Sequence, residues 1–413
     1  MRGPVYAPHR AVRRIGFALT LWLCGVVPCS ADVITDWDAK ATASASFAGF
    51  GEREAAIVDA SMFDAVNSIT PRYRAYLVQE HVTEPTSPEA AAASAAAAAL
   101  ERLHPQKAEE FRSSLRDFLA TLSAPRADVD RGVQLGEKVA ARIFDARAND
   151  GATARESYRP RTQPGVYVPT APVSQWTLAT TRPFALERAD QFRPGPPVSL
   201  SSKEWVTDYN EIKALGAIDS KSRTPEQTET ARFWLMVGPP AYHPLAWQIV
   251  SARHMSLIDS AHFMAVYTIA LTDAYIAVFD AKYHYEFWRP VTAIRNGGGN
   301  PETERDPSWQ SIDATPMHPE YPCAHCIQSG TAAAVIELLG GGPAIPELSL
   351  TSSTAPGVVH RFTSLEAFTT EVANARIWAG FHYRSSTKVG TEMGREVGRY
   401  VVTHCALPLG AGR

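Results

Sequence analysis

The chain has 413 residues, of which 45% are hydrophobic and 20% charged, a composition typical of a globular protein with a large buried core. Its 40 Lys and Arg residues against 43 Asp and Glu residues give a net charge of −3, so no whole-protein field would attract nucleic acid or an acidic membrane surface. We therefore expect no nucleic-acid partner, and any anion binding must depend on local charge.

The N-terminus has the pattern of an export signal. Arginines within Arg2–Arg14 precede the apolar run Ile15–Val27, and the small residues of Cys29–Ala31 precede Asp32. The run is short for a membrane span, and no other segment is interpreted as long and apolar enough for one. We expect residues 1–31 to be a signal peptide, the protein to be periplasmic or secreted, and no integral membrane segment to remain after signal removal.

Helical patterns dominate the next part of the chain, residues 32–150. Apolar residues at helical spacing predict a core helix over Gly51–Ile69. Ser87 and Pro88 open an alanine-rich helix that should reach Leu103, because serine caps and alanine favours helix. Two more helices are predicted over Pro105–Leu122 and Ala127–Ala148.

Residues 151–200 differ from the helical segments in composition and pattern, with many prolines, scattered aromatic residues and poor periodicity. The span is too long for an ordinary connection. Aromatic side chains such as Tyr167 and Trp176 give it surface to bury, which favours an ordered excursion over a disordered linker. We expect it to wrap the helical body or to line the entrance of a cleft.

Residues 201–413 again read as helical, and Ser201–Glu204 resembles a capping box for a helix to Leu215. Further helical patterns cover Thr224–Met236, Tyr242–Val250 and Ser251–Lys282. Within the last pattern, His254, His262 and Asp273 are interpreted as satisfied core or interface groups rather than ligands. Strand-like alternation is nearly absent, so the predicted fold class is mostly α.

Three segments carry candidate site residues, and we call them the first, second and third stations. The first is Asp280–Arg295, where Lys282 and Arg289 are seven positions apart and Pro290 follows directly. Seven residues are nearly two helical turns, so both cations fall on about the same face. An interruption of the helix before Pro290 would let them converge on one anion. The alternative is a solvated basic pair on an amphipathic helix.

A second station, His318–Cys326, precedes a helix predicted over Ile327–Leu339. A helix start favours anions, and a histidine in its first turn can act as a general acid or base. Three alternatives concern the C-x-x-C pair of Cys323 and Cys326: a redox pair, zinc ligands helped by His318 and His325, or a local structural disulfide formed after export.

A third station contains Arg376 and His382, separated by five residues, with Gly380 between them. An arginine fork suits a tetrahedral oxyanion, and a neutral imidazole can attack phosphorus or coordinate a metal.

Taken in order, the stations read Lys-x6-Arg-Pro, Pro-x-x-His and Arg-x5-His. This order resembles the superfamily of type 2 phosphatidic acid phosphatases and vanadium-dependent haloperoxidases, whose signature is Lys-x6-Arg-Pro, Pro-Ser-Gly-His and Ser-Arg-x5-His-x3-Asp. The similarity is densest from about Ser251 to Gly394 and extends to a helix over Glu52–Ile69. It implies a helical bundle of that type with long irregular loops.

The resemblance implies a tetrahedral vanadate or phosphate at the site and assigns it binding positions: Lys282, Arg289, Cys323, Ala324, Arg376 and His382. His382 would be the axial ligand of vanadium, or the nucleophile toward phosphorus, and His325 the acid or base. His318 stands where algal bromoperoxidases are similar in having a histidine, although it could equally be a helix-entry residue. The implied substrates are hydrogen peroxide and a halide, or a phosphate monoester in the phosphatase alternative.

Several positions depart from the signature. Cys323 and Ala324 replace Ser-Gly, and Ala375 replaces the serine before Arg376, which weakens or rearranges oxyanion contacts. Ser386 replaces the aspartate, so the carboxylate that would orient an imidazole is expected to be missing. These departures keep open a non-catalytic oxyanion binder or a redox-responsive protein.

Overall fold

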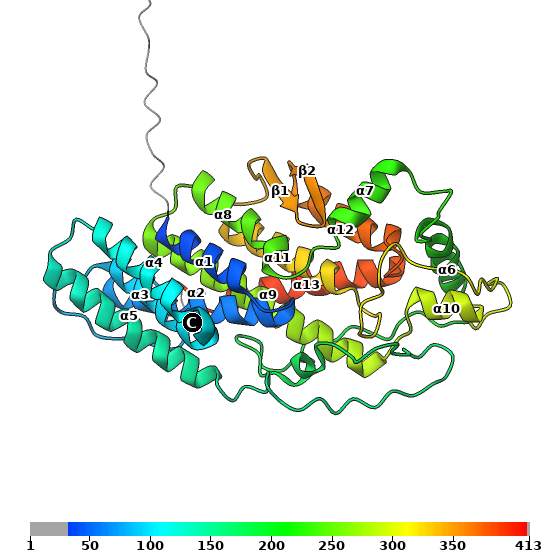
Figure 1. The fold of residues 1–413 in the computed structure, drawn as a ribbon, viewed down its shortest axis with the longest axis horizontal. Helices are drawn as coiled ribbons and strands as arrows, with labels where there is room; N and C mark the ends of the chain where they lie inside the picture. Colours follow the sequence, from blue (N-terminus) through cyan, green and yellow to red (C-terminus); the bar gives the residue numbers. More distant parts are fainter. Residues whose placement is uncertain (1–31, 411–413) are drawn as a thin grey trace, which may run out of the picture. The chain divides into compact units, whose positions relative to one another are not determined.

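The structure is a computed structural model that describes residues 32–410, and the predicted signal peptide lies outside the described residues. Within this range the chain is mostly helical, as predicted, with thirteen α-helices and one small antiparallel sheet (Figure 1). The first helices are α1 (Val33–Ser44), α2 (Gly49–Ile69), α3 (Pro88–Leu103), α4 (Ala108–Thr121) and α5 (Arg126–Arg147).

The alanine-rich helix α3 begins as the sequence predicts. The Ser87 hydroxyl accepts a hydrogen bond from the Ala90 amide at 3.2 Å, and Pro88 occupies the first helical position. Small side chains let α3 pack closely against α5, where a Cβ on Gly132 would lie 2.6 Å from the Ser87 carbonyl oxygen.

Residues 151–202 contain one short 3-10 helix, Trp176–Thr180, and otherwise irregular backbone. The Asp273 carboxylate of helix α9 accepts hydrogen bonds from the amides of Phe184, Ala185 and Leu186 at 2.6, 2.7 and 2.8 Å. The segment is therefore attached to α9, and the prediction that Asp273 is a satisfied core group is confirmed.

The remaining helices are α6 (Lys203–Leu215), α7 (Pro225–Phe233), α8 (His243–Ala252), α9 (Leu257–Tyr285), α10 (Pro290–Asn296), α11 (Ala324–Leu339), α12 (Leu365–Trp378) and α13 (Arg384–His404). Ser202 rather than Ser201 caps α6, since its hydroxyl accepts from the Trp205 amide. Ser256 caps α9, so the helix predicted from Ser251 starts later. His254 precedes this cap and is exposed, so its core interpretation is wrong.

Strands β1 (Leu348–Ser352) and β2 (Ala355–Phe362) form a hairpin that the sequence interpretation did not predict. Only β1 has the alternating burial that marks a half-buried strand, and it is five residues long. The pattern is too short to stand out from the surrounding loop.

Helix α9 runs through the middle of the bundle, where α2, α11 and α13 pack against it (Figure 1). Its length and hydropathy would allow it to span a membrane. By these two criteria, the prediction that no segment after the signal is long and apolar enough for a membrane span is wrong. Its most apolar stretch is entirely buried inside the protein, as expected of a core helix.

Helices α11 and α13 lie very close together because α13 carries glycines at the contact. A Cβ on Gly390 would lie 2.7 Å from the Cys323 carbonyl oxygen, and one on Gly394 would collide with the Ile327 carbonyl. This contact fixes the first turn of α11 against the beginning of α13.

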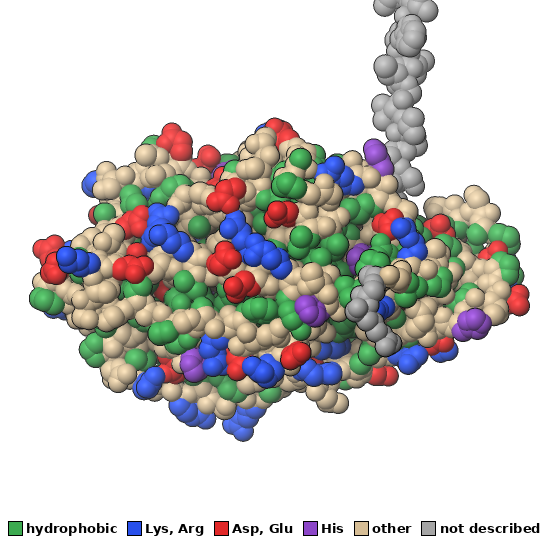
Figure 2. Space-filling model, turned by 180° about the vertical axis from the view of Figure 1, so that it is seen from behind, with side chains coloured by type: hydrophobic (Ala, Val, Ile, Leu, Met, Phe, Trp, Pro, Cys, Tyr) green, Lys and Arg blue, Asp and Glu red, His purple; other side chains and the backbone are tan. Residues whose placement is uncertain are grey.

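The surface carries charges of both signs. Figure 2 shows Lys and Arg side chains interspersed with Asp and Glu side chains over one face, as a net charge of −3 would suggest. The main concentration of cations described below is buried.

The burial of His262 predicts that the free energy of unfolding falls at acidic pH. Burial lowers its pKa to about 4, and its Nε2–H donates to the Ala406 carbonyl at 2.9 Å. An unfolded histidine binds a proton below pH about 6.5, so the stabilisation is complete above that pH and is lost as the pH falls toward about 4.

The free energy of unfolding should fall by at most about 1.4 kcal/mol per pH unit in this window. His262→Gln should reduce this slope in urea denaturation measured at several pH values, whereas His81→Gln, at an exposed position, should not. An unchanged slope in His262→Gln would contradict the assignment.

Candidate active site

The first station is built by the end of one helix and the start of the next. Glu286 adopts a left-handed conformation, φ 51°, that ends α9 one residue after Tyr285, and α10 begins at Pro290. The predicted interruption before Pro290 is therefore confirmed. Lys282 and Arg289 are only 0% and 1% exposed, which excludes the alternative of a solvated basic pair.

Lys282 holds the loop that leads into α11. Its ammonium group donates to the carbonyl oxygens of Pro319, Glu320 and Pro322 at 3.0, 2.8 and 2.5 Å. These bonds use all three of its N–H donors, so contact with an oxyanion would require one of them to break. Burial, and then the charge of Arg289, lowers the pKa of Lys282 well below its usual value.

Arg289 connects the second and third stations. Its Nε donates to the His318 carbonyl at 2.9 Å and its Nη1 to the Phe381 carbonyl at 3.0 Å. Nη1 also lies 3.3 Å from His382 Nε2, and Nη2 lies 3.0 Å from His318 Nδ1. Burial lowers the pKa of Arg289 to about 10, so the guanidinium remains charged at neutral pH.

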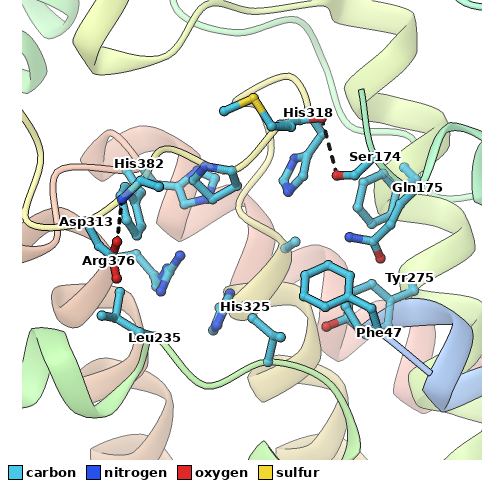
Figure 3. A pocket seen from close by; sticks show the side chains of 18 residues that line it. Phe47, Ser174, Gln175, Leu235, Tyr275, Asp313, His318, His325, Arg376 and His382 are labelled. Carbon is cyan, nitrogen blue, oxygen red and sulfur yellow. Dashed lines mark hydrogen bonds between the residues drawn. The ribbon is translucent and has the colours of Figure 1, made fainter. Parts of the chain in front are cut away.

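A cavity of about 300 Å³ opens beside this arginine, and five of the predicted site residues line it. Figure 3 shows His318, His325, Arg376 and His382 around the cavity, with Phe47, Gln175 and Tyr275 across from them. Ala324 also lines it, whereas Lys282, Arg289 and Cys323 do not.

Arg376 presents free donor capacity to the cavity. Its Nη1 donates to the Trp234 carbonyl at 2.5 Å, and its guanidinium lies 4.8 Å from the centre of the Phe381 ring. Its Nε is buried and has no hydrogen-bond partner among residues 32–410. A buried unpaired donor is costly, so this atom fits a ligand that would accept its hydrogen bond.

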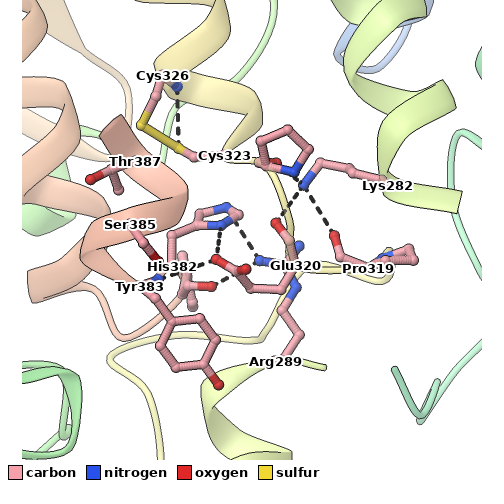
Figure 4. Close-up of polar contacts among 12 residues, drawn as sticks. Lys282, Arg289, Pro319, Glu320, Cys323, Cys326, His382, Tyr383, Ser385 and Thr387 are labelled. Carbon is pink, nitrogen blue, oxygen red and sulfur yellow. Dashed lines mark hydrogen bonds and ion pairs between the residues drawn. A yellow bond between two sulfur atoms is a disulfide. The ribbon is translucent and has the colours of Figure 1, made fainter. Parts of the chain in front are cut away.

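His382 follows a turn at Gly380, whose φ of 80° favours glycine. Its Nδ1 lies 2.8 Å from Glu320 Oε1, which also accepts from the Tyr383 amide at 3.1 Å (Figure 4). A carboxylate accepts hydrogen bonds, so this contact places the hydrogen on Nδ1 and leaves a lone pair on Nε2. The prediction that the orienting carboxylate is missing is therefore wrong: Glu320 supplies it from another segment.

The acid–base properties of this pair follow from burial. Burial raises the pKa of Glu320 to about 7, although Lys282 and Arg289 oppose the shift. Burial, and then the charges of Arg289, Lys282 and Arg376, lowers the pKa of His382 well below its usual range. The imidazole is accordingly neutral at neutral pH and can act as a ligand or nucleophile through Nε2.

The other two histidines are also neutral. His325 is the second residue of α11, and its Nε2 donates to the Met236 carbonyl at 3.0 Å, which leaves Nδ1 as an acceptor. Burial, and then the charge of Arg376, lowers its pKa well below the usual value. His318 Nδ1 lies 3.0 Å from Arg289 Nη2, which can only donate, and 3.1 Å from the Pro319 carbonyl oxygen, which can only accept. Burial, and then the charge of Arg289, lowers the pKa of His318 well below the usual value.

Cys323 and Cys326 form a disulfide at the start of α11, one of the alternatives left open by the sequence. Cys323 Sγ caps the helix by accepting from the Cys326 amide at 3.2 Å. A disulfide sulfur has no S–H, so the expectation that the Cys323 thiol could donate a hydrogen bond to an oxyanion is wrong. No cluster suited to a metal ion occurs within residues 32–410, which removes support for the zinc alternative.

The combined donors suit a tetrahedral oxyanion such as vanadate or phosphate. Arg376 Nε is unpaired, and the amides of Ala324 and His325 at the start of α11 have no hydrogen-bond partner in the described chain. Lys282, Arg289 and Arg376 place three buried positive charges near one buried carboxylate, Glu320. An anion at His382 Nε2 would compensate this charge, so the residues present fit the group.

Besides Glu320, the sequence interpretation did not single out three residues of the cavity wall, although it expected residues 151–200 to wrap the helical body or to line the entrance of a cleft. Ser174 and Gln175 come from the irregular segment and line the cavity, and the Ser174 amide donates to the Met317 carbonyl at 2.8 Å. Phe47, 64% exposed, lies at the mouth. Their sequence neighbourhoods carry no motif, so only the fold reveals them.

The disulfide yields a test with inorganic phosphate as the probe. In a Cys323→Ser/Cys326→Ser double variant, a hydroxyl replaces the cap and regains donor capacity. Phosphate affinity should be unchanged or rise by up to about tenfold, because a hydrogen bond to a charged acceptor contributes on the order of 1.5 kcal/mol.

Isothermal titration calorimetry would measure this affinity, with Cys405→Ser, at the buried free cysteine, as the control. A loss of more than about tenfold would mean that the disulfide itself shapes the oxyanion site.

Comparison with known proteins shows which proteins the chain and its three stations resemble. A family model described as the VCPO second helical-bundle domain matches residues 262–409, which contain all three stations. Vanadium chloroperoxidase from Curvularia inaequalis is 26% identical over 184 residues, covering 37% of this chain and 30% of that protein. The matched region is thus less than a third of the relative's length.

Solved structures share the fold over most of the chain. The first bacterial vanadium-dependent iodoperoxidase has a TM-score of 0.78 at 22% identity, covering 92% of this chain and 97% of that chain. A holo-type bacterial vanadium-dependent chloroperoxidase has a TM-score of 0.64 at 17% identity, covering 89% and 91%. The chain therefore has the fold of these vanadium-dependent haloperoxidases, and its residues 262–409 are similar to the second helical-bundle domain of vanadium chloroperoxidase.

Proposed function

We propose that the protein is an exported vanadate-dependent haloperoxidase that uses hydrogen peroxide to oxidise a halide. The observation that carries this proposal is the pairing, in one cavity, of an imidazole lone pair with an unpaired guanidinium donor, Arg376 Nε. The lone pair is on His382 Nε2, and its contact is Arg289 Nη1 at 3.3 Å. The names of the related proteins, which are vanadium-dependent peroxidases, favour vanadate over phosphate as the resident oxyanion.

Each residue of the site has a separate task in this proposal. His382 Nε2 would hold the vanadium, and Arg376 with the amides of Ala324 and His325 would bind its oxygens. Bound vanadate would supply a Lewis-acid centre that activates hydrogen peroxide toward a halide. Lys282 and Arg289, behind the cavity, would add positive potential while keeping their carbonyl partners. Arg289 Nη1 would give up its 3.3 Å contact with His382 Nε2.

His325 is suited to proton transfer. Its Nε2–H is fixed by the Met236 carbonyl, so Nδ1 can take up a proton from an acidic group bound in the cavity. Its lowered pKa keeps it in the basic, neutral form at neutral pH. The positive charge of Arg376 would then favour rapid release of that proton.

A phosphoesterase is the second candidate, because the same His382 Nε2 lone pair can attack phosphorus. A paired assay on the purified protein separates the two. We expect vanadate-dependent bromination with hydrogen peroxide and no hydrolysis of an aryl phosphate. Hydrolysis that vanadate inhibits, without bromination, would overturn the proposal, and binding of phosphate without either activity would favour a non-catalytic oxyanion binder.

His382→Ala should abolish the activity found in that assay, a loss of at least about 10³-fold, because the only ligand or nucleophile is removed. The matched control is His404→Ala, at the exposed far end of α13, which should retain full activity. Full activity in His382→Ala would refute the site assignment.

We also propose that export removes residues 1–31. Asp32 caps α1 by accepting from the Ile34 amide at 2.9 Å, so cleavage before Asp32 would leave this cap in place. The secreted or periplasmic protein should begin at Asp32 when its N-terminal peptide is identified by mass spectrometry. A protein that retains Met1 in the cytoplasm would contradict export.

A further inference from the structure

Glu320 is an unusual residue in this site because it is a fully buried acid in an irregular loop. Its side chain is 0% exposed, and its Oε1 accepts from both His382 Nδ1 and the Tyr383 amide. Its Oε2 has no hydrogen-bond partner among the described residues. A buried carboxylate with one unsatisfied oxygen is a poor choice for stability alone, which points to a role in the chemistry of the site.

Ser386 occupies the position four residues after His382, where the family signature has aspartate. It lies in the first turn of α13, is 1% exposed and has a hydroxyl without a hydrogen-bond partner in residues 32–410. The Ser386 side chain lowers the pKa of the Glu320 carboxyl group, although the two groups do not meet the geometry of a hydrogen bond. A serine cannot supply a negative charge, and among residues 32–410 Glu320 is the only acid that contacts His382.

We propose that Glu320 is the positioning residue for His382, and that in this chain the orienting carboxylate comes from the loop before α11 instead of from α13. The inference rests on the proposed function for its consequence, since the tautomer that Glu320 selects leaves Nε2 open for the oxyanion. Glu320 does not touch the substrate and acts through His382.

Under this proposal Lys282 also holds the backbone that positions Glu320. Three of its hydrogen bonds hold the carbonyls of Pro319, Glu320 and Pro322, and the Glu320 amide donates to the Phe287 carbonyl at 2.8 Å. The backbone on both sides of Glu320 is therefore fixed by the end of α9 and the segment after it. A carboxylate delivered from a loop needs such support, because a loop alone would not hold it in one orientation.

The test uses the Glu320→Gln variant and orthovanadate as the probe. Glutamine preserves the size of the side chain but removes the charge, so vanadate affinity measured by calorimetry should fall by about 10 to 100-fold. Ser386→Asp added to Glu320→Gln returns a carboxylate from α13 and should recover at least about tenfold of that loss. A purely structural role for Glu320 would give no such recovery.

Asp208→Asn is the matched control. Asp208 of α6 is also a buried acid, but its Oδ2 accepts from the amide and hydroxyl of Ser385, at the start of α13, rather than from His382. Its loss should lower thermal stability and leave vanadate affinity unchanged.

Imidazole nitrogen NMR of ¹⁵N-histidine protein supplies a readout that needs neither vanadate nor activity, with His382→Gln to assign the signal. We expect His382 to carry its proton on Nδ1 in the wild type and to lose this preference in Glu320→Ala, which removes the acceptor; the amide oxygen of Glu320→Gln could still accept from Nδ1–H. A wild-type proton on Nε2 would overturn the proposal, as would an unchanged vanadate affinity in Glu320→Gln.

If the wild-type protein binds no vanadate while His382 still has the Nδ1–H tautomer, the proposed function fails and the positioning role stands. If Glu320→Gln does not fold, the wild-type tautomer and the double variant with Ser386→Asp still decide between the outcomes.

Discussion

The buried ammonium group of Lys282 is the interaction on which the site depends. Its three bonds to the carbonyls of Pro319, Glu320 and Pro322 fix a loop that has no regular secondary structure. The loop in turn sets the start of α11, the position of His318 and the direction of the Glu320 carboxylate. A lysine that the family signature associates with an oxyanion is thus, in this chain, also the support of the protein framework around it.

Charge balance explains why this framework is suited to an anion. Three buried cations and one buried carboxylate leave an excess of positive charge, which lowers the pKa values of Lys282, Arg376 and the three histidines further than burial alone would. Such an arrangement is costly for the folded protein without a compensating ligand. The same excess keeps the histidines neutral, which is the protonation state needed for metal ligation and for proton uptake.

The sequence predicted the parts of the fold and site that depend on local spacing. Helix caps at Ser87 and helix interruption before Pro290 follow from neighbouring residues, and charged residues at fixed intervals marked the three stations. The contact between Glu320 and His382 spans 62 residues, and no local pattern pairs them. The hairpin and the lining contributed by Gln175 likewise depend on tertiary packing.

Two of the departures from the family signature, at Cys323 and Ser386, have different physical consequences. At Cys323 the side-chain donor is lost to a disulfide, and the helix amides of Ala324 and His325 with Arg376 remain as donors for an oxyanion. At Ser386 the carboxylate is absent from the helix but present on the loop, so the imidazole keeps its partner. The tight contact at Gly390 holds α11 and α13 together in both cases. A side chain could therefore change on either helix while the cavity kept the unprotonated Nε2 of His382 beside the unpaired Nε of Arg376.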